Sequence, residues 1–376
     1  MAHAYTPGLR ITDRALVRKQ RLLPIEGEVL VDVGREVKAE DVVARAFLPG
    51  KVQNINIVHL LGVEPGEARK YMTKGEGEEV EAGEILAETR PLLKWFRRQV
   101  ASPVGGTIES ISDVTGQVLL REPSEPLELK AYIDGRVVDV TPGQGVAIET
   151  AAALVQGIFG IGGEATGELS VAVDGPDEVL TADHIASDHI GKIVVGGSLV
   201  EASAFERARE MGVRGIVAGG IRDIDLRELL GYELGVAITG TEEVGFVLMV
   251  TEGFGNIAMA ERTFELLKRY EGRKASISGA TQIRAGVIRP EVVVPRAELA
   301  PEDVDEERTD ARGVEVGDMV RLIRAPFFGR IGRVIGLPPE LRQIPTESVT
   351  RVLEVELVGG ERVVVPRANV ERMEGR

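Results

Sequence analysis

The feature that most constrains the fold is a stretch that the sequence uses twice. VGREVKAEDVVA (33–44) aligns without gaps on EGEEVEAGEILA (76–87). The identical matched residues include Gly34 and Gly77, Val37 and Val80, Ala39 and Ala82, and Ala44 and Ala87. Alternating apolar residues punctuated by glycine are typical of β-hairpins, and a unit that recurs within one chain indicates repeated supersecondary structure. We therefore expect the front of the chain to reuse one kind of hairpin.

A second repeated element predicts a second kind of hairpin that is also reused. Between residues 22 and 150, a glycine followed by valine or isoleucine two and five positions later occurs three times, starting at Gly50, Gly106 and Gly135. From about residue 22 to 170, short apolar alternations are interrupted by Gly, Pro or Asp, which is the pattern of small barrels and sandwiches. The exception is LGVEPGEARKYM (61–72), which predicts a short helical insertion.

The order of these elements resembles a known fold family. EGEEVEAGEILAE (76–88) followed by VASPVGGTIESISDVTGQVL (100–119) resembles the two half-motifs of the lipoyl/biotinyl-like barrel-sandwich hybrid. That fold also occurs as an unmodified module in RNA polymerase largest subunits and in RnfC-type redox proteins. The resemblance covers roughly residues 22 to 150 and implies a small closed β core, but it says little about function because one fold serves many.

The segment between the two half-motifs, RPLLKWFRRQ (90–99), departs from the family pattern. Carrier domains hold their modified lysine in a tight hairpin here, whereas this segment is longer and Trp95 and Phe96 follow Lys94. We therefore expect no lipoyl or biotinyl group, and no other cofactor. Two explanations stay open: the apolar side chains pack against a neighbouring domain, or the segment contacts a partner. The residue types enriched at binding hot spots are here Lys94, Trp95, Phe96, Arg97 and Arg98.

Between about residues 180 and 295 the periodicity changes. Apolar runs such as KIVVGGS and GIVAGGI alternate with amphipathic stretches such as SLVEASAFERAREMG and AMAERTFELLKRYEG. In the amphipathic stretches, apolar residues recur at spacings of three and four, which places them on one helix face. The segment therefore predicts a small α/β domain, Rossmann-like or swivelling, with a mainly parallel sheet.

Most strands of this α/β segment end in glycine or a small hydroxyl residue. Ligands of open parallel sheets bind at the carboxyl ends of the strands, where glycine lets backbone N–H groups approach. A ligand pocket there would include Gly197, Ser198, Gly219, Thr239, Thr241, Glu242, Gly279, Thr281 and Arg284. However, the chain has no dinucleotide-binding, Walker A or nucleophile-elbow motif. Glycines in tight strand-to-helix turns are the alternative explanation.

DHIASDH (183–189) places two Asp-His pairs five residues apart. Imidazole and carboxylate suit a divalent metal. On a helix, however, residues five apart point about 140° from each other, so both histidines reach one ion only from a loop. Capping and surface polarity explain the aspartates without metal, and we predict no metal site.

The last segment is again rich in alternating apolar residues. VGDMVRLIRAPFFGRIGRVIGL (316–337) and the following VELVGGERVVVP resemble a KOW module, the SH3-like barrel motif of the transcription factor NusG and of some ribosomal proteins. The residues that carry the resemblance are Gly317, Asp318, Val320, Gly329, Gly332 and Val334. Its candidates for contact with nucleic acid or protein are Arg321, Arg324, Phe327, Phe328, Arg330 and Arg333. Arginine and aromatic residues grip phosphate and stack on bases, but nearby glutamates dilute the patch, so a protein partner is favoured over RNA or DNA.

These patterns divide the chain into five parts. We predict an N-terminal arm (1–21), a barrel-sandwich hybrid-like domain (22–175), the α/β domain (176–298), a charged linker (299–312) and a KOW/SH3-like domain (313–376). The predicted fold class is multidomain α+β, with a β-rich barrel-sandwich hybrid, a small parallel α/β domain and a C-terminal SH3-like barrel.

The composition limits which classes of function fit the chain. The chain of 376 residues has a net charge of -15 and a pI of about 5.0, which opposes general attraction to nucleic acid or anionic membranes, so any such contact must be local. It has no cysteine and no long apolar run, which is consistent with a cytoplasmic protein. We expect a non-catalytic interaction or scaffold protein, an accessory factor of a transcription or translation assembly. The alternative is an enzyme or small-ligand sensor that uses the α/β strand ends.

Overall fold

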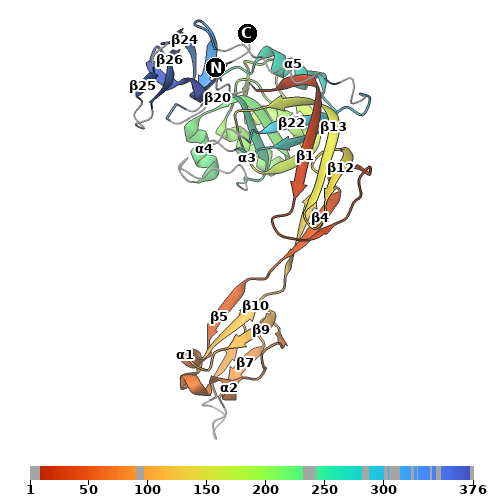
Figure 1. The fold of residues 1–376 in the computed structure, drawn as a ribbon, viewed down its shortest axis with the longest axis vertical. Helices are drawn as coiled ribbons and strands as arrows, with labels where there is room; N and C mark the ends of the chain where they lie inside the picture. The colour runs from red at the N-terminus through yellow and green to blue at the C-terminus, as the bar shows by residue number, and fades with distance from the viewer. Residues whose placement is uncertain are drawn as a thin grey trace.

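The computed structural model of the protein describes residues 9–89, 97–231, 242, 244–281, 288–299, 304, 314–322, 326–327, 329–338, 341–343 and 349–372. The molecule is elongated, with a small β module at one end, a large sheet with helices in the middle and a second small β unit beside that sheet (Figure 1). The protein is thus β-rich and belongs to the multidomain α+β class, as predicted. Within the described residues, no helix is long and apolar enough to cross a membrane.

One long mixed sheet forms the body of the molecule. Its main path is β14-β20-β19-β17-β15-β21-β22-β13-β12-β3, and β1 also pairs with β13. The neighbours from β15 through β17 and β19 to β20 are parallel, whereas β21, β22 and β13 continue in antiparallel pairing. The strands are β1 (Ile11–Leu22), β3 (Glu36–Val37), β12 (Gly135–Thr141), β13 (Gly145–Gln156), β14 (Phe159–Ile161), β15 (Glu164–Val171), β16 (Val179–Leu180), β17 (Ile193–Val195), β18 (Leu199–Val200), β19 (Gly215–Ile221), β20 (Val247–Phe254), β21 (Lys274–Ser278) and β22 (Glu291–Pro295).

Two predicted boundaries differ from this sheet. The predicted arm (1–21) is instead a strand over its second half, because β1 pairs with β13 from Ile11 to Leu22. Its period-2 alternation buries Ala15 and Val17. The predicted boundary at 175 falls inside the sheet, since β14 and β15 precede it and pair with β20 and β17.

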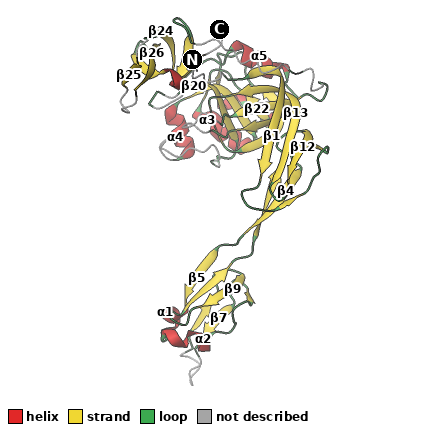
Figure 2. Ribbon diagram, viewed as in Figure 1, coloured by secondary structure: helices red, strands yellow, loops and turns green. Residues whose placement is uncertain are grey.

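Three helices lie beside the body sheet (Figure 2). They are α3 (Ala202–Met211), α4 (Asp223–Leu230) and α5 (Glu261–Arg269). Each buries an apolar face: α3 buries Phe205, α4 buries Leu226 and α5 buries Phe264. Gly212 ends α3 in the left-handed conformation (φ 69°), which glycine adopts without strain. The alternation of strands and helices predicted for this region is therefore present.

Residues 27–48 and 125–141 form what we call the proximal module, next to the body. It contains β2 (Glu28–Val29), β4 (Val42–Leu48) and β11 (Glu125–Lys130), which pair in the order β11-β4-β2, and it contributes β3 and β12 to the long sheet. Two strands, β4 and β11, leave it as an antiparallel ribbon that reaches Leu48 and Glu125.

Residues 49–124 form the distal module at the end of that ribbon (Figure 1). Its strands are β5 (Val52–Asn56), β6 (Glu79–Val80), β7 (Ile85–Glu88), β8 (Gln99–Ala101), β9 (Gly106–Ile111) and β10 (Gln117–Arg121). The predicted helical insertion is present as α1 (Ile57–Leu61), η1 (Pro65–Glu67) and α2 (Ala68–Tyr71). The module has a hydrophobic core of its own, which includes Leu86, Ile108, Val118 and Leu120. A separate core indicates a separately packed unit.

The C-terminal β unit (residues 314–372) is a six-stranded sheet in the order β25-β26-β24-β23-β28, with β27 paired to β26. The strands are β23 (Met319–Leu322), β24 (Ile331–Gly336), β25 (Leu341–Gln343), β26 (Val349–Leu357), β27 (Arg362–Pro366) and β28 (Val370–Arg372), and η6 (Arg367–Asn369) precedes β28. It too has its own core, around Val320, Val334 and Val355.

Candidate functional site

The repeated stretch has the same local structure in both modules, but it is not the predicted hairpin, because its two strands pair with other strands: β3 with β12 and β4 with β11, and likewise β6 with β9 and β7 with β8. In the proximal module the backbone N–H of Lys38 donates to the Asp41 carboxylate over 2.8 Å. At the matched position of the distal module, the N–H of Glu81 donates to the Glu84 carboxylate over 2.9 Å. The sequence repeat is therefore a repeat of local structure.

The second repeated element also has the same role in both modules. Gly135 pairs with Val37 in the proximal module, and Gly106 pairs with Val80 in the distal module. A Cβ added to Gly135 would lie 2.5 Å from the carbonyl oxygen of Glu149, and one added to Gly106 would lie 2.2 Å from that of Arg121. Both glycines are thus required by a close approach of backbone.

The turn before this second element also contacts the repeated stretch in the same way in both modules. Ala131 N–H donates to the Asp41 carbonyl over 2.9 Å, and Ser102 N–H donates to the matched Glu84 carbonyl over 2.7 Å, so the turns 131–134 and 102–105 are equivalent.

The structure describes only part of the predicted contact segment, Lys94–Arg98. Lys94, Trp95 and Phe96 lie outside the described residues. Arg97 forms an ion pair with Glu88. Arg98 donates to the Leu61 carbonyl over 3.1 Å, and its backbone N–H donates to the Thr89 hydroxyl over 2.9 Å.

Arg98 therefore supports the C-terminal end of α1, where Gly62 adopts the left-handed conformation. A cation at this end of a helix also interacts favourably with the carbonyl groups. The two described arginines of the segment hold its flanks against the distal module, at the end that carries α1 and α2 (Figure 1).

That end of the distal module presents apolar side chains to solvent. Leu60 is 53% exposed on α1 and Val114 is 85% exposed in the turn between β9 and β10. Arg69 of α2 supports the turn that carries Val114, because it donates to the Asp113 carboxylate over 2.7 Å and to the Glu76 carboxylate over 2.8 Å. The end is thus a braced surface with apolar and charged groups side by side.

The predicted ligand pocket at the α/β strand ends is filled by backbone at its described glycines. A Cβ added to Gly197 would lie 2.3 Å from the carbonyl oxygen of Glu178, one on Gly219 2.3 Å from that of Ile257, and one on Gly279 2.2 Å from that of Ile161. These close approaches support the alternative explanation, in which the glycines serve tight turns and do not line a ligand pocket. Thr239, Thr241 and Arg284 lie outside the described residues.

The other described members of the predicted pocket are Ser198, Thr281 and Glu242. The Ser198 hydroxyl donates to the Asp177 carbonyl over 2.8 Å. The Thr281 hydroxyl, which is buried, accepts from the backbone N–H of Gly160 over 2.9 Å. Glu242 is half-buried. Ser198 and Thr281 therefore fasten neighbouring segments of the body.

The C-terminal β unit covers the carboxyl end of β20. Arg321 in β23 forms an ion pair with Glu252 in β20 at 3.2 Å, and both side chains are about 95% buried. Glu252 also accepts from the backbone N–H of Ala260 over 3.0 Å. At Gly253 an added Cβ would lie 2.3 Å from the Gly329 carbonyl oxygen. The unit is thus joined to the body by a buried ion pair and a close backbone contact.

This contact corrects the prediction for Arg321 as an intermolecular contact. Its guanidinium is buried against the body and is not presented to nucleic acid. Of the other candidates, Arg330 pairs with Glu361 at 2.7 Å and lies over the Phe327 ring, and Arg333 donates to the Gly317 carbonyl over 3.4 Å. Arg324 and Phe328 lie outside the described residues.

The two Asp-His pairs form two successive 3₁₀ turns, η3 (Ala182–His184) and η4 (Ser187–His189). The Nδ1 atom of each histidine accepts from the backbone N–H three residues earlier, at Thr181 and Ala186, over 3.1 Å. Burial lowers the pKa of His189, although the nearby Asp188 opposes the shift. Both imidazoles therefore cap their own turns. Within the described residues, no group of three or more potential ligands has metal-binding geometry.

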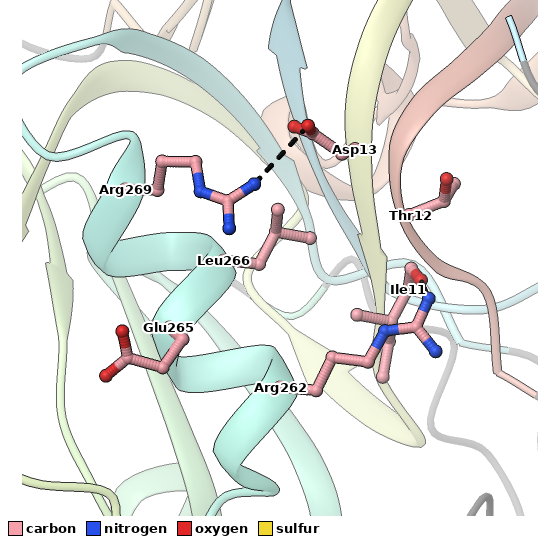
Figure 3. Close-up of a pocket in the computed structure, with 7 residues that line it drawn as sticks. All are labelled: Ile11, Thr12, Asp13, Arg262, Glu265, Leu266 and Arg269. Carbon is pink, nitrogen blue, oxygen red and sulfur yellow. Dashed lines mark hydrogen bonds and ion pairs between the residues drawn. The ribbon is translucent and has the colours of Figure 1, made fainter.

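A shallow cavity of about 180 Å³ between β1 and α5 was not predicted (Figure 3). Asp13 at its edge accepts from the Tyr270 hydroxyl and pairs with Arg296 at 3.2 Å and Arg269 at 3.4 Å. Burial and the Asp13 hydrogen bond raise the pKa of Tyr270 to about 12. Asp13 of β1 therefore binds Arg269 of α5, Tyr270 and Arg296 at once, and it joins β1 to α5. The residues that line the cavity are Ile11, Thr12, Asp13, Arg262, Glu265, Leu266 and Arg269.

A polar cluster joins the proximal module to the body, and the sequence patterns did not predict it. Lys274 of β21 lies 2.8 Å from a Glu40 carboxylate oxygen and 2.9 Å from one of Asp134. Burial alone would raise the pKa of both carboxyl groups, but the Lys274 hydrogen bonds and charge lower the pKa of each. The carboxylates and the lysine therefore hold each other charged across the junction.

Tyr132 lies in the same junction. It is 4% exposed and has φ 73°, which is uncommon for a residue other than glycine. Its hydroxyl donates to Glu291 over 3.3 Å, and Glu291 forms an ion pair with Lys19. Burial, with the Glu291 charge, raises the pKa of Tyr132 well above its ordinary value. No local pattern in the sequence marks this tyrosine, because its partners come from three distant strands.

The sequence matches no protein-family model, and no curated protein matches it.

Proposed function

We propose that this protein is a non-catalytic interaction protein that uses the distal module to reach a partner. The observation that supports the proposal best is the construction of that module. It has its own core and stands away from the body on the β4–β11 ribbon (Figure 1). A unit placed in this way exposes both ends to other molecules.

The segment Lys94–Arg98 is the proposed contact. Its C-terminal end is anchored at the end of the distal module that carries α1, by Arg98 on Leu61 and by Arg97 on Glu88. Its sequence combines the module's only tryptophan, Trp95, with Phe96 and Lys94. Aromatic and cationic side chains on a braced support are typical of binding hot spots, and exposed Leu60 and Val114 extend the apolar part of the same end.

As for the assembly, we infer an accessory role in a transcription or translation complex. The support is the resemblance of two segments to modules embedded in such machines, the barrel-sandwich hybrid and the KOW module. The partner on the C-terminal β unit would be a protein, or RNA through Arg330 and Phe327. The small-ligand alternative draws no support from Gly197, Gly219 and Gly279, since backbone fills the space beside each of them.

Affinity capture of the tagged full-length protein from its native lysate, with and without nuclease, tests this proposal. The test variant is Lys94→Glu/Trp95→Ala, which leaves the Arg97 and Arg98 anchors unchanged. The matched control is Phe47→Ala, an aromatic truncation at a 58% exposed position of β4. We expect the control to retain the same protein partners and the test variant to lose them.

Nuclease treatment separates direct protein contact from bridging by nucleic acid. If the test variant captures the same partners as the unaltered protein, the proposed contact segment is wrong. If neither form captures a macromolecule, the interaction function itself is wrong.

A further inference from the structure

The strand β1 lies at an edge of the long sheet. It has 12 residues and pairs along one side only, with β13 (Figure 1). The strands at the two ends of the sheet's main path are much shorter: β14 has three residues and β3 has two. A short edge strand presents few unpaired backbone groups, whereas a long one is a template for a further strand. The second side of β1 is therefore the part of the body best suited to accept a strand.

The pairing with β13 shows which backbone groups of β1 face this open side. In an antiparallel pair, residues alternate between hydrogen-bonded and non-bonded positions. Leu16 and Arg18 lie opposite Ala151 and Glu149 of β13. The Ala151 carbonyl accepts from the Arg296 N–H over 2.8 Å, on the β22 side of β13, and the Glu149 carbonyl lies beside β12. The N–H and C=O groups of Leu16 and Arg18 therefore point away from β13, to the open side.

By the same alternation, Gln20 is the third residue whose backbone faces the open side. Among the described residues, no strand pairs with this side of β1. Within the same part of the chain, no group forms a hydrogen bond there with the backbone of Leu16, Arg18 or Gln20. At the N-terminal end of β1, by contrast, α5 contacts the strand through Arg262. The open side of residues 14–20 is here called the β1 edge.

The exposed side chains along the β1 edge combine positive charge with an apolar group. Arg14, Leu16, Arg18 and Gln20 are exposed, while the residues between them are buried or half-buried. The guanidinium of Arg18 lies 3.9 Å from the Asp139 carboxylate, and both side chains are at least half exposed, so this ion pair contributes little. The two arginines therefore present positive charge on either side of Leu16.

We propose that the β1 edge binds an extended segment of another protein, which adds to the long sheet as a further strand beside β1. Cross-strand neighbours on one face interact directly, so the segment carries an apolar residue opposite Leu16. Two positions away on either side it carries acidic residues, opposite Arg14 and Arg18. Backbone hydrogen bonds supply the affinity of such a contact and alternate side chains its specificity. The β1 edge lies on the body and is thus separate from the Lys94–Arg98 contact of the distal module.

Two other occupants fit this edge less well. Nucleic acid would bring phosphates, which accept hydrogen bonds but cannot donate them to the outward carbonyls of Leu16 and Arg18. A second copy that paired through its own β1 edge would bring the arginines of both copies together. Residues 14–20 contain no acidic residue that could neutralise them, and charge of one sign along an edge opposes pairing between like strands. An acidic strand of a different protein meets both conditions.

Site-specific photo-crosslinking of the full-length protein in its own cells tests the assignment. One chain carries a photoreactive phenylalanine at Leu16, and a second chain carries it at Val114, on the distal module. The Leu16 probe is combined with Gln20→Pro or Arg18→Glu, and Arg18→Lys is the matched control. Gln20→Pro removes an N–H that faces the open side, a position at which edge strands tolerate proline. Chemical denaturation checks that each variant folds, and mass spectrometry maps the crosslinked segment.

We expect the Leu16 probe to crosslink to an extended protein segment with acidic residues at alternate positions. Gln20→Pro should lower the yield about tenfold, since one backbone hydrogen bond at about 1.4 kcal/mol is lost. Arg18→Glu should lower it about fivefold, the size of one exposed ion pair at about 1 kcal/mol, and Arg18→Lys should leave it within about twofold. None of these substitutions should change the yield from Val114. If Gln20→Pro does not fold, the contrast between the two Arg18 variants decides.

Crosslinks from Leu16 to nucleic acid, to a second copy or to residues 300–313 of the same chain would overturn the proposal. Equal yields from Arg18→Glu and Arg18→Lys would overturn it too. Crosslinks from Val114 with none from Leu16 would retain the distal contact and reject the β1 edge. Crosslinks from Leu16 with none from Val114 would support the β1 edge and count against the distal contact.

Discussion

The proximal and distal modules share a repeated strand–turn–strand stretch but differ in what surrounds it. In the proximal module the turn end is buried: Ala39 and Tyr132 have almost no exposure, and Lys274 of the body neutralises its carboxylates. In the distal module the matched turns are exposed, and the module is held to the rest of the chain by one ribbon. The difference shows that the repeat determines the local turn, while distant strands determine whether that turn is covered.

Truncating the buried tyrosine should produce the largest contrast. Tyr132→Ala removes an almost fully buried aromatic side chain, and we expect it to lower the free energy of unfolding by about 3 kcal/mol. Pro103→Ala, at the matched exposed position, should change it by less than about 0.5 kcal/mol. Chemical denaturation of both variants measures the difference. Equal effects would mean that the two ends are not differently covered.

The ribbon between the modules is the next place to test. A Cβ added to Gly50 would lie 1.8 Å from the Glu122 carbonyl oxygen, so Gly50→Ala forces the two chains apart. We expect a loss of about 2 kcal/mol, seen as earlier unfolding of the distal module in denaturant. Gly66→Ala is the control, because nothing lies within 4 Å of its added Cβ. A neutral Gly50→Ala would show that the ribbon does not need this close approach.

A smaller effect is expected from the lysine that joins body and proximal module. Lys274→Met leaves Glu40 and Asp134 without their shared cation, and we expect a loss of about 1.5 kcal/mol, less than for a fully buried pair because Lys274 is partly exposed. Lys38 also pairs with Asp134 but its side chain is 72% exposed, so Lys38→Met should be nearly neutral. If Lys38→Met is the more destabilising change, the junction is held differently.

The junction should also depend on pH. The pKa values of Glu40 and Asp134 are lowered in the folded state, so their stabilising contribution is complete above the unfolded pKa values near 4 and is lost as the pH falls through the folded values. Amide hydrogen exchange should therefore show the 38–41 and 131–134 turns opening below about pH 4. A junction equally protected well below that pH would contradict the role of these carboxylates.

Local patterns in the sequence predicted the repeated strand–turn–strand stretch, the α/β alternation and the β-rich C-terminal unit. The predicted hairpin pairing was wrong, because β3 and β4 pair with β12 and β11 and not with each other. They did not predict β1 as part of the long sheet, because Ala15 and Val17 are buried only through pairing with β13, which lies far along the chain. Arg321 was misread as a surface contact, since only the position of Glu252 in a distant strand makes it a buried ion pair. Tyr132 was missed for the same reason. What a residue contacts across units is set by the packing of units, which short-range periodicity does not encode.

The central claim is that the distal module is the part of the chain that binds a partner. Amide hydrogen exchange of the full-length protein, alone and in the complex recovered from its own cells, tests it most directly. We predict new protection within residues 49–124 and unchanged protection at 38–41 and 131–134, which are already covered by the body. Protection gained only in the body or the C-terminal β unit, with the distal module unchanged, would contradict it.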